Sequence, residues 1–138
     1  MEIKQISVFL ENSAGRLGEV TRALANAGVN LRAISLADTE TFGILRLIVN
    51  DCDLALNALK EAGYTAKLTD VVAVEIEDRP GSLADVMELF RKTNVNIEYL
   101  YASLEGKSGK AVVVLKLEDH SKGLQILKEN GVSLINSF

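Results

Sequence analysis

Residues 78–86 read DRPGSLADV, and residues 12–20 read NSAGRLGEV. Each stretch follows a run in which apolar residues alternate and precedes a run in which they recur three or four positions apart. This pattern predicts a corner between a strand and a helix. An offset of 66 residues superimposes the two corners, and the same offset aligns VN at 29–30 with VN at 95–96. The chain therefore contains the same strand-to-helix corner twice.

The similarity between the two halves continues beyond a single insertion. EGKSGK at 105–110 takes the place of TETFG at 39–43 and moves the offset to 68 residues, after which LKE at 59–61 aligns with LKE at 127–129. Two registers separated by one insertion in a turn are typical of a duplicated domain. We therefore interpret the chain as an internal duplication.

Both halves predict the same order of elements, strand–helix–strand–strand–helix–strand. Alternation in residues 4–10 indicates a strand, and the spacing in residues 15–28 indicates a helix that places Leu17 in the core. Leu83 is expected to hold the same place in the second half. The expected strands are 4–10, 29–37, 43–50, 64–68, 71–77, 95–103, 110–118 and 132–136, and the expected helices are 15–28, 53–63, 82–93 and 121–131.

This βαββαβ order predicts an α+β fold. Both helices of a half must bury their apolar stripes, so we expect them on one face of a four-stranded antiparallel sheet. Right-handed crossovers then favour the ferredoxin-like arrangement, in which the first and third strands are central. We expect two domains, residues 1–69 and 70–138, separated only by Thr69 and Asp70 and packed as a rigid pair without a flexible linker.

Composition and charge argue against several classes of function. The formal charge of -4 and the absence of a basic stripe disfavour nucleic acid as a partner. No apolar run reaches the roughly 18 residues that cross a bilayer, and MEIKQISVFL at 1–10 is too short and too charged for a signal peptide. The single cysteine, Cys52, fits a reducing compartment. We expect a cytoplasmic protein without membrane contact.

The sequence offers no set of residues that would carry out catalysis. It contains no Ser/His/Asp combination, no paired cysteines with metal-ligand spacing and no phosphate-binding loop. The third strand of each half carries aliphatic residues, where an RNA-recognition module would expose aromatic ones. We therefore expect a protein that is not an enzyme and that holds neither a cofactor nor a metal.

DRPGSL at 78–83, with VNIEYL at 95–100 opening the second strand, resembles the ACT domain, the small regulatory module that senses amino acids. The resemblance continues through GYTAKLTDVVAVEIEDRPGSL at 63–83 and ISLADTETFGILRLIV at 34–49, and covers essentially the whole chain. The chain is similar to stand-alone tandem ACT proteins, which carry no catalytic domain. It departs from the family pattern at Ala14, where the usual proline is missing.

The corners have the chemistry to hold a free amino acid. The first turn of a helix presents unpaired N–H groups and the positive end of its dipole, which attract a carboxylate. Gly15 and Gly81 allow close approach to the backbone. Asn12 and Asp78 offer side-chain oxygens to an ammonium group. The alternative interpretation is structural, because Asx side chains also cap helices and glycine eases tight turns.

The two corners are not equivalent. Ala14 stands where Pro80 stands in the second corner, so the first corner is expected to be less rigid. Asp78 is charged where Asn12 is neutral, which makes the second corner the stronger ammonium acceptor. The sequence therefore favours the second corner as the binding site.

The resemblance implies a ligand between the corner of one ACT unit and the second strand of its neighbour, within one chain or between subunits. We expect a regulatory homo-oligomer, most simply a dimer, in which a free amino acid with an aliphatic or aromatic side chain shifts packing or the binding of a regulated enzyme or regulator. The alternative is an interaction or assembly module that has lost the ligand. The expected ligand-binding residues are Asn12, Ala14, Gly15, Arg16, Leu17, Asn30, Leu31, Asp78, Pro80, Gly81, Ser82, Leu83, Asn96 and Ile97.

Overall fold

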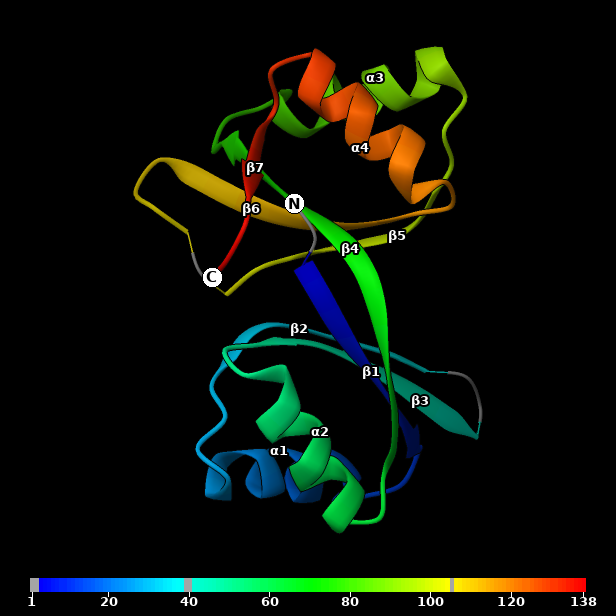
Figure 1. The fold of residues 1–138 in the computed structure, drawn as a ribbon, viewed down its shortest axis with the longest axis vertical. Helices are drawn as coiled ribbons and strands as arrows, with labels where there is room; N and C mark the ends of the chain where they lie inside the picture. The colour runs from blue at the N-terminus through cyan, green and yellow to red at the C-terminus, as the bar shows by residue number, and fades with distance from the viewer. Residues whose placement is uncertain (1–2, 39–40, 105) are drawn as a thin grey trace. The chain divides into compact units, whose positions relative to one another are not determined.

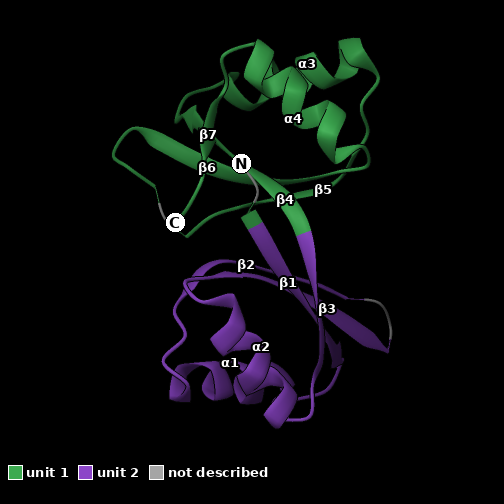
Figure 2. Cartoon of the chain, in the orientation of Figure 1, with its two compact units in different colours: residues 1–3, 70–138 green, residues 4–69 purple. Residues whose placement is uncertain are grey.

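The computed structural model describes residues 3–38, 41–104 and 106–138. The expected turn at 38–41 and the insertion at 105–110 thus fall partly outside the described residues. Two compact units make up the chain: residues 4–69 form one, and residues 70–138 together with Ile3 form the other (Figure 2). The division lies between Thr69 and Asp70.

The unit of residues 4–69 is a sheet with two helices on one face (Figure 1). Its strand order is β2-β3-β1-β4, so the first and third strands are central. Strand β3 runs antiparallel to both β1 and β2. The elements are β1 (Ile3–Glu11), α1 (Arg16–Asn26), β2 (Leu31–Asp38), β3 (Phe42–Val49), α2 (Cys52–Glu61) and the first part of β4 (Thr65–Glu77).

The unit of residues 70–138 repeats this plan. Its strand order is β5-β6-β4-β7, and β6 and β7 both pair antiparallel with β4. Its helices also share one face of the sheet (Figure 1). The elements after β4 are α3 (Ser82–Thr93), β5 (Ile97–Ala102), β6 (Lys110–Leu117), α4 (His120–Glu129) and β7 (Ser133–Ile135). The predicted α+β fold with ferredoxin-like units is confirmed.

One expected boundary between strands is wrong. The sequence analysis separates a strand at 64–68 from a strand at 71–77, whereas β4 is continuous from Thr65 to Glu77. Neither Thr69 nor Asp70 interrupts the extended backbone, and the stretch contains no glycine or proline that would favour a break. The last strand of one unit and the first strand of the other are therefore one element.

Each unit has its own apolar core between sheet and helices. The first contains Ile6, Val8, Leu10, Val20, Leu24, Leu45, Leu47, Val49 and Leu59, and the second contains Val72, Val74, Val86, Phe90, Val113, Leu115, Leu117 and Leu127.

Leu17 is an exception to the predicted helical stripe. Its side chain is 38% exposed, so the expectation that it lies in the core is wrong. Leu83, its counterpart, is half-buried and packs against the second core. Leu17 sits in the first turn of α1, where it lines a cavity together with residues of β1, β2 and β3.

Candidate functional site

Both corners have the same backbone conformation. Gly15 has φ 85° and ψ -10°, and Gly81 has φ 90° and ψ -14°, so each adopts the left-handed region immediately before its helix. An L-residue with a Cβ in this region costs about 1–2 kcal/mol. Glycine is therefore required at these two positions by conformation.

The same hydrogen bonds shape both turns. At the first corner the Asn12 N–H donates to the carbonyl of Thr41 (3.0 Å), and the Ser13 N–H donates to the carbonyl of Glu11 (2.9 Å). The first of these bonds ties the end of β1 to the residue before β3, and the second closes the turn itself. The equivalent bonds at the second corner run from Asp78 N–H to Gly109 and from Arg79 N–H to Glu77, each 3.0 Å. The two halves thus also share the main-chain hydrogen bonds of their corners.

The helices that follow the corners lack a side-chain cap. The N-cap residues of α1 and α3 are Gly15 and Gly81, which have no side chain that could cap the helix. The second helix of each unit differs: Asp51 accepts from the N–H of Leu54, and Asp119 accepts from the N–H of Lys122, both at 3.1 Å. At the corners the N–H of the first helical residue donates to the main chain instead, from Arg16 to the carbonyl of Ser13 and from Ser82 to the carbonyl of Arg79, each at 3.4 Å.

A cavity of about 240 Å³ adjoins the first corner. It combines predicted residues of the corner with strand residues that the sequence analysis did not select. Its lining residues are Leu10, Glu11, Asn12, Ser13, Arg16, Leu17, Leu36, Asp38 and Gly43.

Arg16 organises the charges of the first corner. Its guanidinium pairs with Glu11 at 3.3 Å and with Glu19 at 3.2 Å, and the hydroxyl of Tyr64 donates to Glu19 at 3.0 Å. The two carboxylates, Glu11 foremost, raise the pKa of Arg16 above its usual value. The cation is thus engaged by the protein itself and serves the corner by holding these elements together.

A second cavity, of about 420 Å³, lies on another side of Arg16. It is lined in part by Phe9, Phe42 and Tyr64. Phe9 is 44% and Phe42 is 56% exposed, so this part of the unit presents apolar surface to its surroundings.

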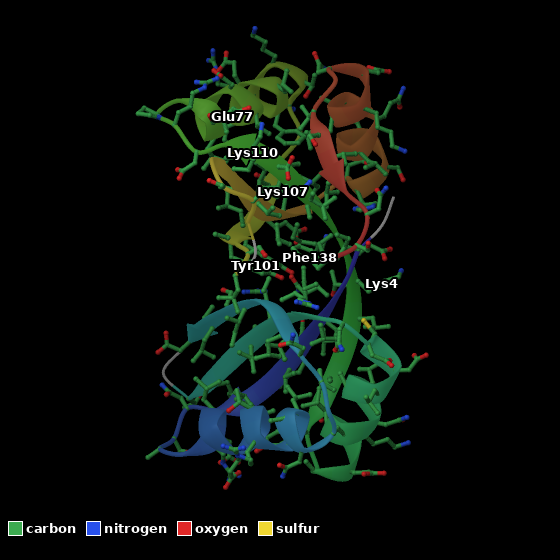
Figure 3. All side chains as sticks on the ribbon, turned by 90° about the vertical axis from the view of Figure 1, so that its left-hand side faces the viewer. Lys4, Glu77, Tyr101, Lys107, Lys110 and Phe138 are labelled. Carbon is green, nitrogen blue, oxygen red and sulfur yellow. The ribbon has the colours of Figure 1, made fainter. Side chains whose placement is uncertain are left out.

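The second corner replaces this charge cluster with a different arrangement. Glu77 forms an ion pair with Lys110 on the neighbouring strand, which lowers the pKa of Glu77 (Figure 3). Ser82, in the position of Arg16, is only 6% exposed, and its hydroxyl oxygen is buried without a hydrogen-bond partner. The guanidinium of Arg79 donates to the carbonyl of Pro80 at 3.2 Å.

The predicted residues at the start of β2 and β5 lie away from the corner of their own unit. Helix α1 has 11 residues, which at 1.5 Å per residue places Asn30 and Leu31 about 16 Å from the corner. The Asn30 N–H donates to the side-chain oxygen of Asn50 at 2.9 Å. Asn96 lines a separate cavity of about 490 Å³. Within a unit, the structure therefore does not join these residues to the corner.

Leu36, Asp38 and Gly43 line the cavity at the first corner, although they are not among the expected ligand-binding residues. The register of the sheet brings them to the corner: Leu10 pairs with Gly43, and Gly43 pairs with Asp38. An explicit pairing of the expected strands at 4–10 and 43–50 would have indicated that the start of the third strand lies beside the end of the first.

The described part of the chain contains no group of three or more His, Cys, Asp or Glu side chains arranged to hold a metal ion. In residues 3–38, 41–104 and 106–138, every helix is too short or too polar to cross a membrane.

Two ferredoxin-like units with a glycine corner before each first helix define a protein of the ACT class. The chain belongs to the family of ACT domain pairs, whose model matches residues 1–137. No curated protein shows a significant match to the sequence.

Solved structures agree with this assignment. Protein BT0572 from Bacteroides thetaiotaomicron is 41% identical with a TM-score of 0.92, and the match covers 98% of this chain and 92% of that one. The ligand-free regulatory subunit of aspartate kinase from Thermus thermophilus is 20% identical with a TM-score of 0.67, covering 93% and 91%. The corresponding subunit from Thermus flavus is 21% identical with a TM-score of 0.64, covering 94% and 92%. The two kinase subunits share the fold.

Proposed function

We propose that this protein is a regulatory ACT protein that binds a free amino acid at its corners. The observation that carries the proposal is the contrast between its helices. Asp51 and Asp119 cap α2 and α4, whereas α1 and α3 begin without any side-chain cap. Open N–H groups at the positive end of a helix dipole suit a carboxylate. The α-carboxylate of the ligand takes the place that an Asp side chain takes in the other two helices.

The ammonium group of the ligand is assigned to the Asx residue of the corner. The side chains of Asn12 and Asp78 leave the main chain three residues before Gly15 and Gly81 respectively, and both are exposed. An oxygen acceptor beside a helix N-terminus complements a zwitterion. At the first corner, Leu10, Leu17 and Leu36 offer apolar surface to an aliphatic or aromatic ligand side chain.

Each corner supplies its own support for the proposal. The first adjoins a cavity of about 240 Å³. The second holds the buried hydroxyl of Ser82, which has no hydrogen-bond partner among the residues that the structure describes. Buried polar groups are nearly always hydrogen-bonded, so this hydroxyl is suited to a bound water. The charge of Asp78 favours the second corner for the ammonium group, and the cavity favours the first for the side chain.

The proposed response is a change in assembly or in partner binding. We expect a cytoplasmic homodimer in which Asn30 and Leu31, or Asn96 and Ile97, of a second copy of the chain complete the site. A ligand that contacts two subunits stabilises the arrangement in which both contacts exist. Its binding thereby alters the affinity for a regulated enzyme or another regulator.

A thermal-shift screen against the twenty amino acids tests the proposal. A ligand at a hundred times its dissociation constant stabilises the folded protein by about 2.7 kcal/mol. Asn12→Ala and Asp78→Ala should reduce this shift. Asp51→Ala is the matched control, because it removes a cap and lowers stability but should keep the shift that the ligand produces. If no amino acid at millimolar concentration stabilises the wild-type protein, the proposal fails.

The alternative is an assembly module without a small ligand. The exposed rings of Phe9 and Phe42 favour it, since large apolar side chains at the surface are typical of contacts with another protein. This function predicts a stable oligomer that Phe42→Ala weakens, together with indifference to all twenty amino acids.

A further inference from the structure

The C-terminal end of α4 carries the one Asn–Gly pair of the sequence, Asn130–Gly131. In such a pair the main-chain nitrogen of glycine can attack the side-chain amide carbon of asparagine, because glycine has no side chain to obstruct the approach. Both residues are exposed, so water and hydroxide reach them. The pair therefore has the chemistry for spontaneous deamidation.

This reaction needs water and no other reagent. The main-chain nitrogen of Gly131 loses its proton and forms a bond to Cγ of Asn130, while the bond from Cγ to Nδ2 breaks. Nδ2 leaves as ammonia with that proton, and a five-membered succinimide ring remains. Water then opens the ring at one of its two carbonyl carbons, which gives either aspartate or isoaspartate.

The fold holds both reacting groups in hydrogen bonds. Nδ2 of Asn130 donates to the carbonyl of Ile126 at 2.8 Å, which turns the side-chain amide towards the preceding turn of the helix. The N–H of Gly131 donates to the carbonyl of Lys128 at 3.2 Å. The attack therefore requires that both bonds break, which is a local opening of the helix end.

The first unit has the same helix end without the reactive side chain. Ala62 stands in the place of Asn130, and Gly63 stands in the place of Gly131. Both glycines have a positive φ, 86° and 68° respectively, and the N–H of Gly63 donates to the carbonyl of Lys60 at 3.0 Å. Both helix ends thus require the glycine, whereas only the second unit carries the asparagine.

Deamidation alters the connection between α4 and β7. An aspartate at position 130 lacks the Nδ2 donor and places a negative charge at the negative end of the helix dipole. An isoaspartate lengthens the main chain by one methylene group. The next residue but one, Val132, donates its N–H to Leu127 at 3.0 Å and packs against the second core, and β7 begins directly after it. Either product therefore weakens the attachment of β7.

We infer that Asn130 is a deamidation site of the second unit, and that opening of the C-terminal end of α4 sets the rate of its modification. The inference does not depend on the proposed function, because the reaction involves no ligand. It assigns to the second unit a covalent change that the first unit cannot undergo at the same place.

Peptide mapping by mass spectrometry, on the full chain incubated at pH 8, tests the inference. Deamidation of Asn130 should be slower by about tenfold or more in the folded protein than in protein unfolded by guanidinium chloride, because only the open fraction reacts. In the unfolded chain Asn130 should react faster than Asn136, which is followed by serine instead of glycine.

Two matched variants test the role of local opening. Lys128 and Lys60 are exposed lysines in the last turns of α4 and α2. Lys128→Gly lowers the helix propensity beside Asn130 and should accelerate its deamidation in the folded protein by about threefold. Lys60→Gly makes the same change in the other unit and should leave the rate at Asn130 unchanged.

The outcomes address each part of the inference. If Asn130 reacts no faster than Asn136 in the unfolded chain, it is not a preferred site and the inference is overturned. If folded and unfolded protein react equally fast, the helix end gives no protection and the gating is overturned. If Lys60→Gly accelerates the reaction as much as Lys128→Gly, opening of α4 does not set the rate.

The stability of two variants tests the consequence for β7. Asn130→Asp should unfold at a lower urea concentration than Asn130→Ala, which reproduces the helix end of the first unit. Equal midpoints would show that the product does not weaken the unit. Circular dichroism verifies the fold of each variant, and the comparison of folded with unfolded wild type decides the protection without any variant.

Discussion

Replacement of Gly15 or Gly18 by alanine should have opposite effects on stability. The two glycines lie three positions apart at the start of α1, both are exposed, and a Cβ added to either meets no heavy atom within 4 Å. Steric contact therefore cannot distinguish them. Their backbones differ, because Gly15 has φ 85° and Gly18 lies inside the helix.

The magnitudes follow from this difference. An alanine forced into the left-handed region costs about 1–2 kcal/mol. Alanine in place of glycine inside a helix stabilises by about 1 kcal/mol. Gly15→Ala should thus lower the free energy of unfolding, Gly18→Ala should raise it, and the two variants should differ by about 2–3 kcal/mol.

Urea denaturation followed by circular dichroism measures both variants against wild type. Equal midpoints for the two variants would refute the reasoning, because the left-handed conformation of the corner is then not what requires glycine. Gly81→Ala, at φ 90°, should repeat the loss seen for Gly15→Ala.

Three further predictions concern other parts of the chain. Gly123→Ala should destabilise by about 1–3 kcal/mol in urea denaturation, because its Cβ would overlap a leucine side chain of β6. Burial, followed by Asp53, raises the pKa of Cys52, so thiol labelling at pH 8 should be slower than for free cysteine and faster in Asp53→Asn. Lys110 lowers the pKa of Glu77, so the ion pair stabilises the fold above the ordinary glutamate pKa of about 4.3. This contribution is lost as the pH falls through the lowered pKa of Glu77. The difference in stability between wild type and Glu77→Gln should therefore disappear in acid.

The two corners show which features of the structure can be predicted from local sequence. Gly15 and Gly81 were predicted at turns before helices because a glycine after an Asx residue, followed by helical spacing, is a local signal. Their left-handed conformation agrees with the alternative interpretation, in which glycine eases a tight turn, and α1 begins at Arg16 rather than at Gly15. The choice between a cap and an open helix end was not available from sequence, because Asn12 and Asp78 are equally good capping residues. Only the coordinates show that Asp51 and Asp119 cap their helices, whereas the N-cap of α1 and of α3 is a glycine.

Leu17 and β4 show where local patterns fail. Helical spacing predicts which face Leu17 occupies but does not reveal whether a strand lies beneath the first turn of the helix. Continuity of β4 through Thr69 and Asp70 likewise depends on the strands beside it, since a polar pair without glycine or proline suits either a turn or a strand.

The sequence by itself determined the duplication, the βαββαβ order and the two glycine corners, because periodicity and turn chemistry act between residues close together in the chain. The tertiary structure alone decided which residues surround the first corner. Leu36, Asp38 and Gly43 reach it through antiparallel pairing with residues far from them in sequence. The size of a cavity depends on every side chain that packs around it, so it cannot be predicted from a pattern of residues that are close together in the sequence.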